Sequence, residues 1–229
     1  MTSRVELVFD FVSPNAYLIW WPLRDLCDRY EAALTVIPAF LGGMHKLTGN
    51  APPMIRDAEV KGKNAYSMLE MNRFITKHGL TRWKMHPQFP FNSILLQRML
   101  FVADQDGRAV QFADAMLRAI WEEGLDIASP EAVGAAVTAA GFDAADLFER
   151  AQSDAVKQGL VASTDRVVER GAFGIPTMWV SNGDEAGEMF FGKERLTQVA
   201  LVAAAHRQGA AERAGMTSTS AWLAAHTRS

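Results

Sequence analysis

The sequence has almost no cysteine. Cys27 is the one cysteine among 229 residues, so the chain can form neither an internal disulfide nor a Cys-x-x-Cys pair for redox chemistry or zinc. Its apolar neighbours in a predicted helix favour a core position for this thiol. The N-terminal stretch MTSRVELVFDF lacks the apolar core of a secretory signal, so we expect a protein of the reducing cytoplasm.

Three further absences limit the possible partners. No apolar run is long enough to span a membrane. The 23 Lys and Arg residues are scattered among 26 Asp and Glu residues, so the chain lacks the basic patch typical of nucleic-acid-binding proteins. The five histidines show no metal-ligand spacing, and we predict no metal site. With 49% hydrophobic residues, the composition is that of a globular protein with a core of ordinary size.

The first part of the chain has the pattern of a β-α-β unit. Residues 4–12 (RVELVFDFV) carry apolar residues on both faces, which predicts a strand covered on both sides. A helix is predicted over residues 14–30, and the β-branched run at residues 33–38 predicts a second strand. The length of the connection suits parallel pairing of the two strands.

A helical block follows, and strands return only near the C-terminus. Residues 42–54 (GGMHKLTGNAPPM) predict a loop rich in Gly and Pro. The segments TMWVSN and GEMFFG predict an antiparallel hairpin, and a last helix is predicted over residues 193–206. Helical patterns occupy five stretches between the loop and the hairpin, at 63–78, 92–104, 109–123, 130–140 and, in broken form, 144–170.

This order of elements predicts an α/β fold. Four short strands at the two ends of the chain can only form one modest sheet together, so the helical block is predicted to be an insertion. The fold class is a thioredoxin-like domain with an inserted all-helical domain. We assign residues 1–42 and 172–208 to the thioredoxin-like domain, residues 43–171 to the insertion, and residues 209–229 to a C-terminal extension.

The Ser13-Pro14 pair after the first strand allows two interpretations. Ser at the N-cap and Pro at the first helical position are a common helix start, and Ser129-Pro130 opens another predicted helix with no catalytic candidate nearby. A helix N-terminus at the carboxyl end of a parallel strand, however, presents free N–H groups that favour an anion or a thiolate. Ala16 stands at N3, so no capping box occupies those groups.

A second candidate segment is GAFGIPTMWV, residues 171–180. Pro176 can simply begin a strand. In a thioredoxin arrangement, a cis Ile175-Pro176 bond would turn the Ile175 backbone toward the helix N-terminus, where it can pair with an extended peptide. Because position 13 holds serine and Cys27 lies about 20 Å further along the helix, any reactive thiol must come from outside the chain.

Six motifs in order resemble a known family, the 2-hydroxychromene-2-carboxylate isomerases and kappa-class glutathione transferases, which are relatives of the DsbA disulfide oxidases. The resemblance runs from about residue 4 to residue 206. Each motif alone is weak, but six in sequence are specific. The motifs are FDFVSPNAYL, PAFLGGMHKLTGNAPP, KNAY, FPFNSILLQR, GAFGIPTMWV and FFGKERL.

The resemblance implies a DsbA-like protein that uses glutathione as its thiol. Ser13 matches the active-site serine of the family, whose hydroxyl would stabilise the glutathione thiolate. Glu194 matches an acidic residue, usually Asp, that binds the γ-glutamyl amine, and Lys193 replaces a small polar residue beside it. The residues that the resemblance assigns to glutathione binding, besides Ser13, are Asn50, Lys63, Ile175, Pro176, Lys193 and Glu194.

The resemblance also implies a homodimer and a small aromatic substrate, with Asn50, Lys63 and Asn92 on the substrate side. Trp83, a tryptophan of the inserted block, is added as a candidate for an aromatic pocket wall. The implied reaction is the cis-trans isomerisation of 2-hydroxychromene-2-carboxylate or a related aromatic catabolite, by thiolate addition, bond rotation and elimination. Two alternatives stay open: a kappa-type glutathione transferase, and a non-catalytic DsbA-like protein that binds a thiol or a peptide. A dithiol oxidase is disfavoured because position 13 lacks the necessary cysteine.

Overall fold

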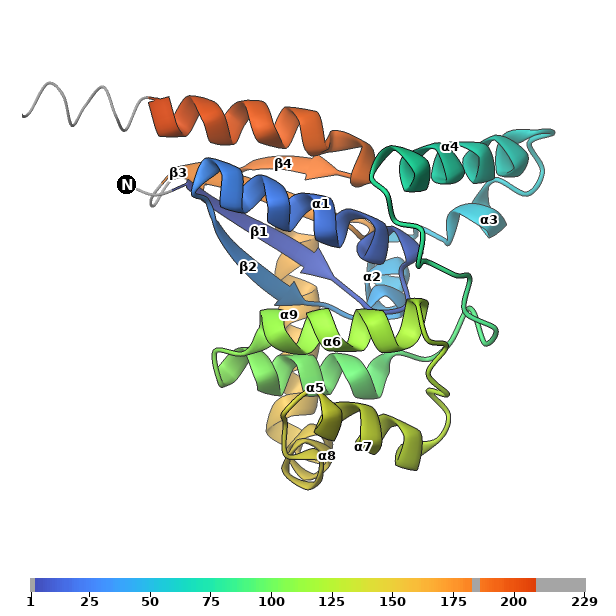
Figure 1. The fold of residues 1–229 in the computed structure, drawn as a ribbon, viewed down its shortest axis with the longest axis vertical. Coiled ribbons are helices and arrows are strands. Elements are labelled where there is room, and N and C mark those ends of the chain that lie inside the picture. Colours follow the sequence, from blue (N-terminus) through green and yellow to red (C-terminus); the bar gives the residue numbers. More distant parts are fainter. Residues whose placement is uncertain (1–2, 183–185, 209–229) are drawn as a thin grey trace, which may run out of the picture.

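A four-stranded sheet joins the two ends of the described chain, which comprises residues 3–182 and 186–208 of a computed structural model (Figure 1). Strand β1 pairs in parallel with β2 and antiparallel with β3, and β3 pairs antiparallel with β4. The predicted β-α-β unit and hairpin are therefore confirmed, and they share one sheet. The strands are β1 (Ser3–Phe9), β2 (Ala33–Pro38), β3 (Thr177–Asn182) and β4 (Glu188–Phe191), in the order β2-β1-β3-β4.

Helices cover both faces of the sheet. Helix α1 (Pro14–Tyr30) connects β1 with β2 and lies in front of the sheet in Figure 1, whereas α9 (Asp154–Glu169) passes behind it. The predicted last helix begins as a 3-10 turn, η1 (Lys193–Arg195), which packs against α1. The described part of the helix itself spans residues 196–208.

The central block is helical, as predicted. Ser153 divides its last stretch into two helices, and the Ser153 hydroxyl accepts a hydrogen bond from the Val156 N–H at 3.3 Å as the cap of α9. Helix α4 (Lys63–Lys77) and the short α3 (Pro53–Arg56) project to one side as an arm, the α3–α4 arm (Figure 1). The helices below the sheet in that view are α5 (Ile94–Gln105), α6 (Ala109–Trp121), α7 (Pro130–Ala139) and α8 (Ala144–Gln152).

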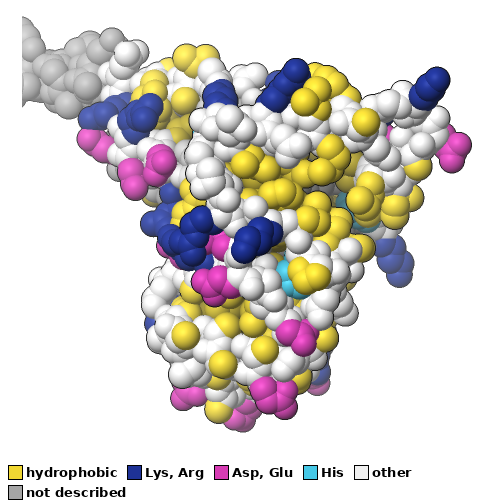
Figure 2. All heavy atoms as spheres, turned by 45° about the vertical axis from the view of Figure 1, so that its right-hand side comes forward, with side chains coloured by type: hydrophobic (Ala, Val, Ile, Leu, Met, Phe, Trp, Pro, Cys, Tyr) yellow, Lys and Arg dark blue, Asp and Glu magenta, His cyan; other side chains and the backbone are white. Residues whose placement is uncertain are grey.

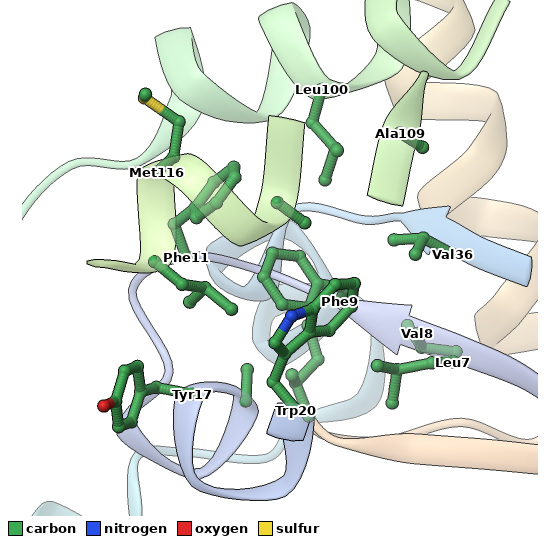
Figure 3. Packing of buried hydrophobic residues seen from close by; sticks show 14 of the residues in the cluster. Leu7, Val8, Phe9, Phe11, Tyr17, Trp20, Val36, Leu100, Ala109 and Met116 are labelled. Atoms are coloured by element: carbon green, nitrogen blue, oxygen red, sulfur yellow. The ribbon is translucent and has the colours of Figure 1, made fainter. Parts of the chain in front are cut away.

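One hydrophobic core runs from the sheet into the helical block. Phe9 of β1 packs edge-on against Trp20 of α1, with ring centroids 5.5 Å apart (Figure 3). The ring centroid of Phe11 lies 5.0 Å from that of Phe9 and 6.0 Å from that of Phe112 in α6. Because both parts of the chain share this core, the domain boundaries near residues 42 and 171 stay predictions. The predicted extension lies outside the described residues.

The prediction of a loop over residues 42–54 is wrong. Helix α2 (Leu41–Thr48) begins there, and α3 follows it. Gly42 provides room for close packing rather than for a turn, because a Cβ atom at this position would lie 3.1 Å from the ring of Phe40. The turn comes at Gly49, whose φ of 71° ends α2.

Gly159 of α9 is predicted to resist substitution. A Cβ atom there would lie 2.5 Å from the Phe101 ring of α5, so Gly159→Ala should lower the free energy of unfolding by about 1–3 kcal/mol. Gly134→Ala in α7 is the matched control, because its nearest atom is 3.5 Å away. It should raise stability by about 0.5–1 kcal/mol through helix propensity. Urea unfolding measures both changes, and a stabilising Gly159→Ala would contradict the packing argument.

Candidate active site

Ser13 lies at the N-terminus of α1, where the chain leaves β1. Its backbone is extended (φ −81°, ψ 115°), and its hydroxyl accepts a hydrogen bond from the Ala16 N–H at 3.3 Å. The same hydroxyl donates to the Ile175 carbonyl oxygen, also at 3.3 Å, and the residue is only 4% exposed. Ser13 therefore caps its helix and also contacts the second candidate segment.

The Ile175 segment is fixed beside the helix start. The Ile175-Pro176 bond is cis, as predicted. The Pro176 carbonyl oxygen accepts a hydrogen bond from the Gly192 N–H at 2.9 Å, which ties the segment to the turn after β4. Within residues 3–182 and 186–208, the Ile175 N–H has no hydrogen-bond partner, so it is available to a ligand.

Ser13 and Ile175 line a pocket of about 490 Å³. Figure 2 shows hydrophobic side chains gathered on this side of the molecule, beside the α3–α4 arm. A polar helix start within an apolar wall is typical of a site for a small organic ligand. The aromatic part of the wall is formed by Phe40, Phe89, Phe91 and Phe191.

Asn50 lies in the same pocket, just after α2. Its Nδ2 donates a hydrogen bond to the Phe173 carbonyl oxygen at 2.7 Å, and its Oδ1 accepts one from the Ala51 N–H at 2.9 Å. Close packing continues at Gly174, where a Cβ atom would lie 2.9 Å from the Phe191 ring. These contacts join the end of α2 to the Ile175 segment, so Asn50 is held beside the helix start.

Of the other three residues predicted on the substrate side, only Asn92 lines this pocket. Its side-chain oxygen accepts a backbone N–H at the start of α5, at 3.0 Å. The Lys63 ammonium instead contacts the Asp57 carboxylate at 2.9 Å. Trp83 stacks on Trp121 with ring centroids 6.5 Å apart. The structure thus separates Lys63 and Trp83 from the wall around Ser13.

Lys193 and Glu194 lie in a second cavity of about 500 Å³, between α1, α4 and the last helix. Lys193 is 5% exposed, its ammonium pairs with the Glu194 carboxylate, and it lies 5.4 Å from the centre of the Phe74 ring. The structure does not bring this pair into the pocket that contains Ser13. Their roles in glutathione binding therefore stay predictions.

Asp10 holds the turn that carries Ser13, although the sequence patterns did not single it out. Its carboxylate accepts hydrogen bonds from the Leu41 N–H at 2.8 Å and the Val12 N–H at 3.1 Å, and its carbonyl accepts one from Ser13. The predicted strand extends to residue 12, whereas this turn ends β1 at Phe9. Burial raises the pKa of Asp10 to about 6, against the opposing influence of the Leu41 hydrogen bond. The sequence signal that could have identified Asp10 is an acidic residue within an otherwise apolar predicted strand.

Arg56 and His45 also line the Ser13 pocket and were missed. His45 lies in the predicted loop and Arg56 between that loop and the next predicted helix, where the sequence carries no signal for the direction of a side chain. Cys27 is 3% exposed, and burial raises its pKa to about 12, so the predicted core position is confirmed. Among the described residues, no cluster of His, Cys, Asp and Glu could hold a metal ion, and no helix is long and apolar enough to cross a membrane.

The fold matches a known protein family. A family model described as a DSBA-like thioredoxin domain matches residues 4–204. The chain belongs to this family. A solved structure of a 2-hydroxychromene-2-carboxylate isomerase has the same fold as this DSBA-like protein, with a TM-score of 0.71 and 23% identity over 95% of this chain and 98% of that chain. The predicted fold class is thereby confirmed.

Two groups of curated relatives resemble the DSBA-like protein about equally. A 2-hydroxychromene-2-carboxylate isomerase from Pseudomonas putida is 27% identical over 196 residues, which cover 84% of this chain and 90% of that protein. Human glutathione S-transferase kappa 1 is 26% identical over 212 residues, which cover 87% and 90%. The resemblance inferred from the motifs is confirmed.

The raised pKa of Asp10 predicts a pH-dependent contribution to stability. The folded protein binds this proton more tightly than the unfolded chain, whose Asp has an ordinary value of 3.8. The contribution is therefore fully present below about pH 4 and is lost as the pH rises through about 6. Between these limits, wild type should lose about 2–3 kcal/mol of unfolding free energy relative to Asp10→Asn. Urea unfolding at several pH values tests this, and parallel curves for the two proteins would contradict it.

Proposed function

We propose that this DSBA-like protein is a glutathione-dependent cis-trans isomerase of 2-hydroxychromene-2-carboxylate or a related aromatic catabolite. The observation that carries the proposal is the Ser13 hydroxyl, which lies between the Ala16 N–H and the Ile175 carbonyl in a pocket with aromatic walls. The isomerases from Pseudomonas putida and Sphingobium xenophagum, each 27% identical to this chain, support the choice of reaction.

The pocket fits a bound thiolate. The Ser13 hydroxyl can donate to sulfur in place of donating to the Ile175 carbonyl. The N–H groups in the first turn of α1 add positive potential, and no acidic residue in that turn offsets it. The Ile175 N–H, which has no partner among the described residues, can pair with the backbone of the cysteinyl unit. The described lining of the pocket contains no Asp or Glu to repel the charge on sulfur.

Bound glutathione would supply a thiolate that adds to a conjugated double bond and leaves after rotation about the resulting single bond, so that none is consumed. The chain itself would hold the reactants and stabilise charge. Ser13 would lower the pKa of the bound thiol, and the amides of Asn50 and Asn92 lie in the pocket wall, where they can bind substrate oxygens. The phenylalanine side chains would bind the aromatic ring and exclude water.

Ser13→Ala is predicted to remove most of the activity. Loss of the Ser13 hydroxyl as a donor to sulfur should lower kcat/KM for glutathione-dependent isomerisation by at least about 100-fold. Ser129→Ala is the matched control, because Ser129 caps α7 with the same geometry and accepts the Ala132 N–H at 3.1 Å. Each variant should lose about 1 kcal/mol of stability, but Ser129→Ala should keep full activity. Unchanged turnover in Ser13→Ala, or turnover without glutathione, would refute the mechanism.

A kappa-type glutathione transferase is the second candidate, since the human kappa protein is nearly as similar as the isomerases. In a transferase the thiol adduct is the product, so thiol is lost in proportion to substrate. Titration of free thiol during turnover separates the two reactions: an isomerase leaves the thiol concentration constant. The homodimer and the cytoplasmic location stay predictions.

Glu194 provides a separate test of glutathione binding. If its carboxylate turns from Lys193 toward the γ-glutamyl amine, Glu194→Gln should weaken glutathione binding by about tenfold, as expected for the loss of a charged hydrogen bond. Binding of an analogue that lacks this amine should not change. Glu149→Gln, an exposed substitution in α8, is the control. Calorimetry measures all the affinities, and equal losses for glutathione and the analogue would reject this role of Glu194.

A further inference from the structure

The described lining of the Ser13 pocket contains one Lys or Arg side chain, Arg56, and no Asp or Glu. His45 is the other basic residue in the wall. Burial lowers the pKa of His45 below its ordinary value of 6.5, and the positive charge of Arg56 lowers it further. His45 is therefore mostly neutral at pH 7, and Arg56 supplies the positive charge of the pocket.

Arg56 is held in place by Asp57. Its Nε and Nη2 each donate to one oxygen of the Asp57 carboxylate, both at 2.9 Å. Asp57 is only 5% exposed, and the Arg56 guanidinium and the Lys63 ammonium together hold its pKa far below the usual range. Arg56 thus has one defined orientation rather than the many of a free surface arginine.

One carboxylate cannot neutralise two cations. The Lys63 ammonium contacts the same Asp57 oxygen as Arg56 Nε, also at 2.9 Å, so the group of three side chains carries a net charge of +1. Asp57 uses one edge of the guanidinium. Within residues 3–182 and 186–208, the Nη1 of Arg56 makes no hydrogen bond. A guanidinium can bind a second carboxylate through its remaining N–H groups.

We propose that Arg56 is the specificity-determining residue that binds the carboxylate of an aromatic ligand whose ring lies among the phenylalanines of the Ser13 pocket. Asp57 and Lys63 act as positioning residues: Asp57 orients Arg56, and Lys63 offsets the charge of Asp57. The inference deepens the proposed function and rests on it for the aromatic nature of the ligand. Of the two cations that contact Asp57, it assigns the substrate carboxylate to Arg56 rather than to Lys63, which the sequence analysis placed on the substrate side.

Calorimetry with cinnamate and its neutral amide, cinnamamide, in the absence of glutathione, tests this assignment. Wild type should bind cinnamate at least about tenfold more tightly than cinnamamide, as expected for a charged hydrogen-bonded pair. Arg56→Gln should abolish the preference, and Arg56→Lys should keep part of it. Lys61→Gln is the matched control, because Lys61 is an exposed cation of the neighbouring loop that does not line the pocket; it should keep the full preference.

Equal affinity of wild type for the two ligands, or an undiminished preference in Arg56→Gln, would overturn the assignment. Glutathione also carries carboxylates that Arg56 could bind, and a glutathione titration tests this alternative. Weaker glutathione binding in Arg56→Gln, with cinnamate binding unchanged, would also overturn the assignment. None of these measurements needs turnover. A failure of the isomerase activity would thus reject the proposed function, while cinnamate binding would still decide the role of Arg56.

Discussion

The site depends on the hydrogen bond between the Ser13 hydroxyl and the Ile175 carbonyl oxygen, which joins segments 162 residues apart. The contact forms because β1 and β3 are antiparallel neighbours, with Val8 opposite Thr177, so the end of one strand meets the beginning of the other. Ser129 shows the same cap without such a partner segment. The pairing of β1 with β3, rather than the Ser-Pro dipeptide, therefore places a second segment beside this helix start and so forms the pocket.

Buried polar side chains hold together the chain segments beside this pocket. The Gln97 amide of α5 donates to the carbonyl oxygens of Phe9 and Ala39, both at 2.7 Å, where β1 and β2 end. Asp10 joins the turn before α1 to the first residue of α2. Each buried bond would cost about 1–3 kcal/mol to leave unmade. These hydrogen bonds thus join the helical block to the sheet next to the site, where the two parts also share one hydrophobic core.

The sequence analysis succeeded where the signal is local or depends on the order of elements. Strand and helix periods placed most elements within a few residues, and their order placed Ser13 opposite Ile175. It failed at α2, because adjacent glycines usually mark a turn, whereas here Gly42 packs on Phe40. It also chose Lys63 for the substrate side and missed Arg56. Both contact Asp57, and only the placement of the α3–α4 arm decides which one lines the pocket.

Under the proposed function, the thiol side and the aromatic side of the pocket place different requirements on the amino-acid sequence. The thiol side uses the backbone of Ile175, which any residue could present, and one hydroxyl at position 13. The aromatic side uses side chains from the segments around Phe40, Arg56 and Phe91. Substitutions in those segments can change the ligand while the thiol side stays intact. On the proposed function, this division would let one fold serve either isomerisation or transfer. The acceptor bound by the side chains, rather than the position of the thiol, would then decide whether the adduct breaks down or is released.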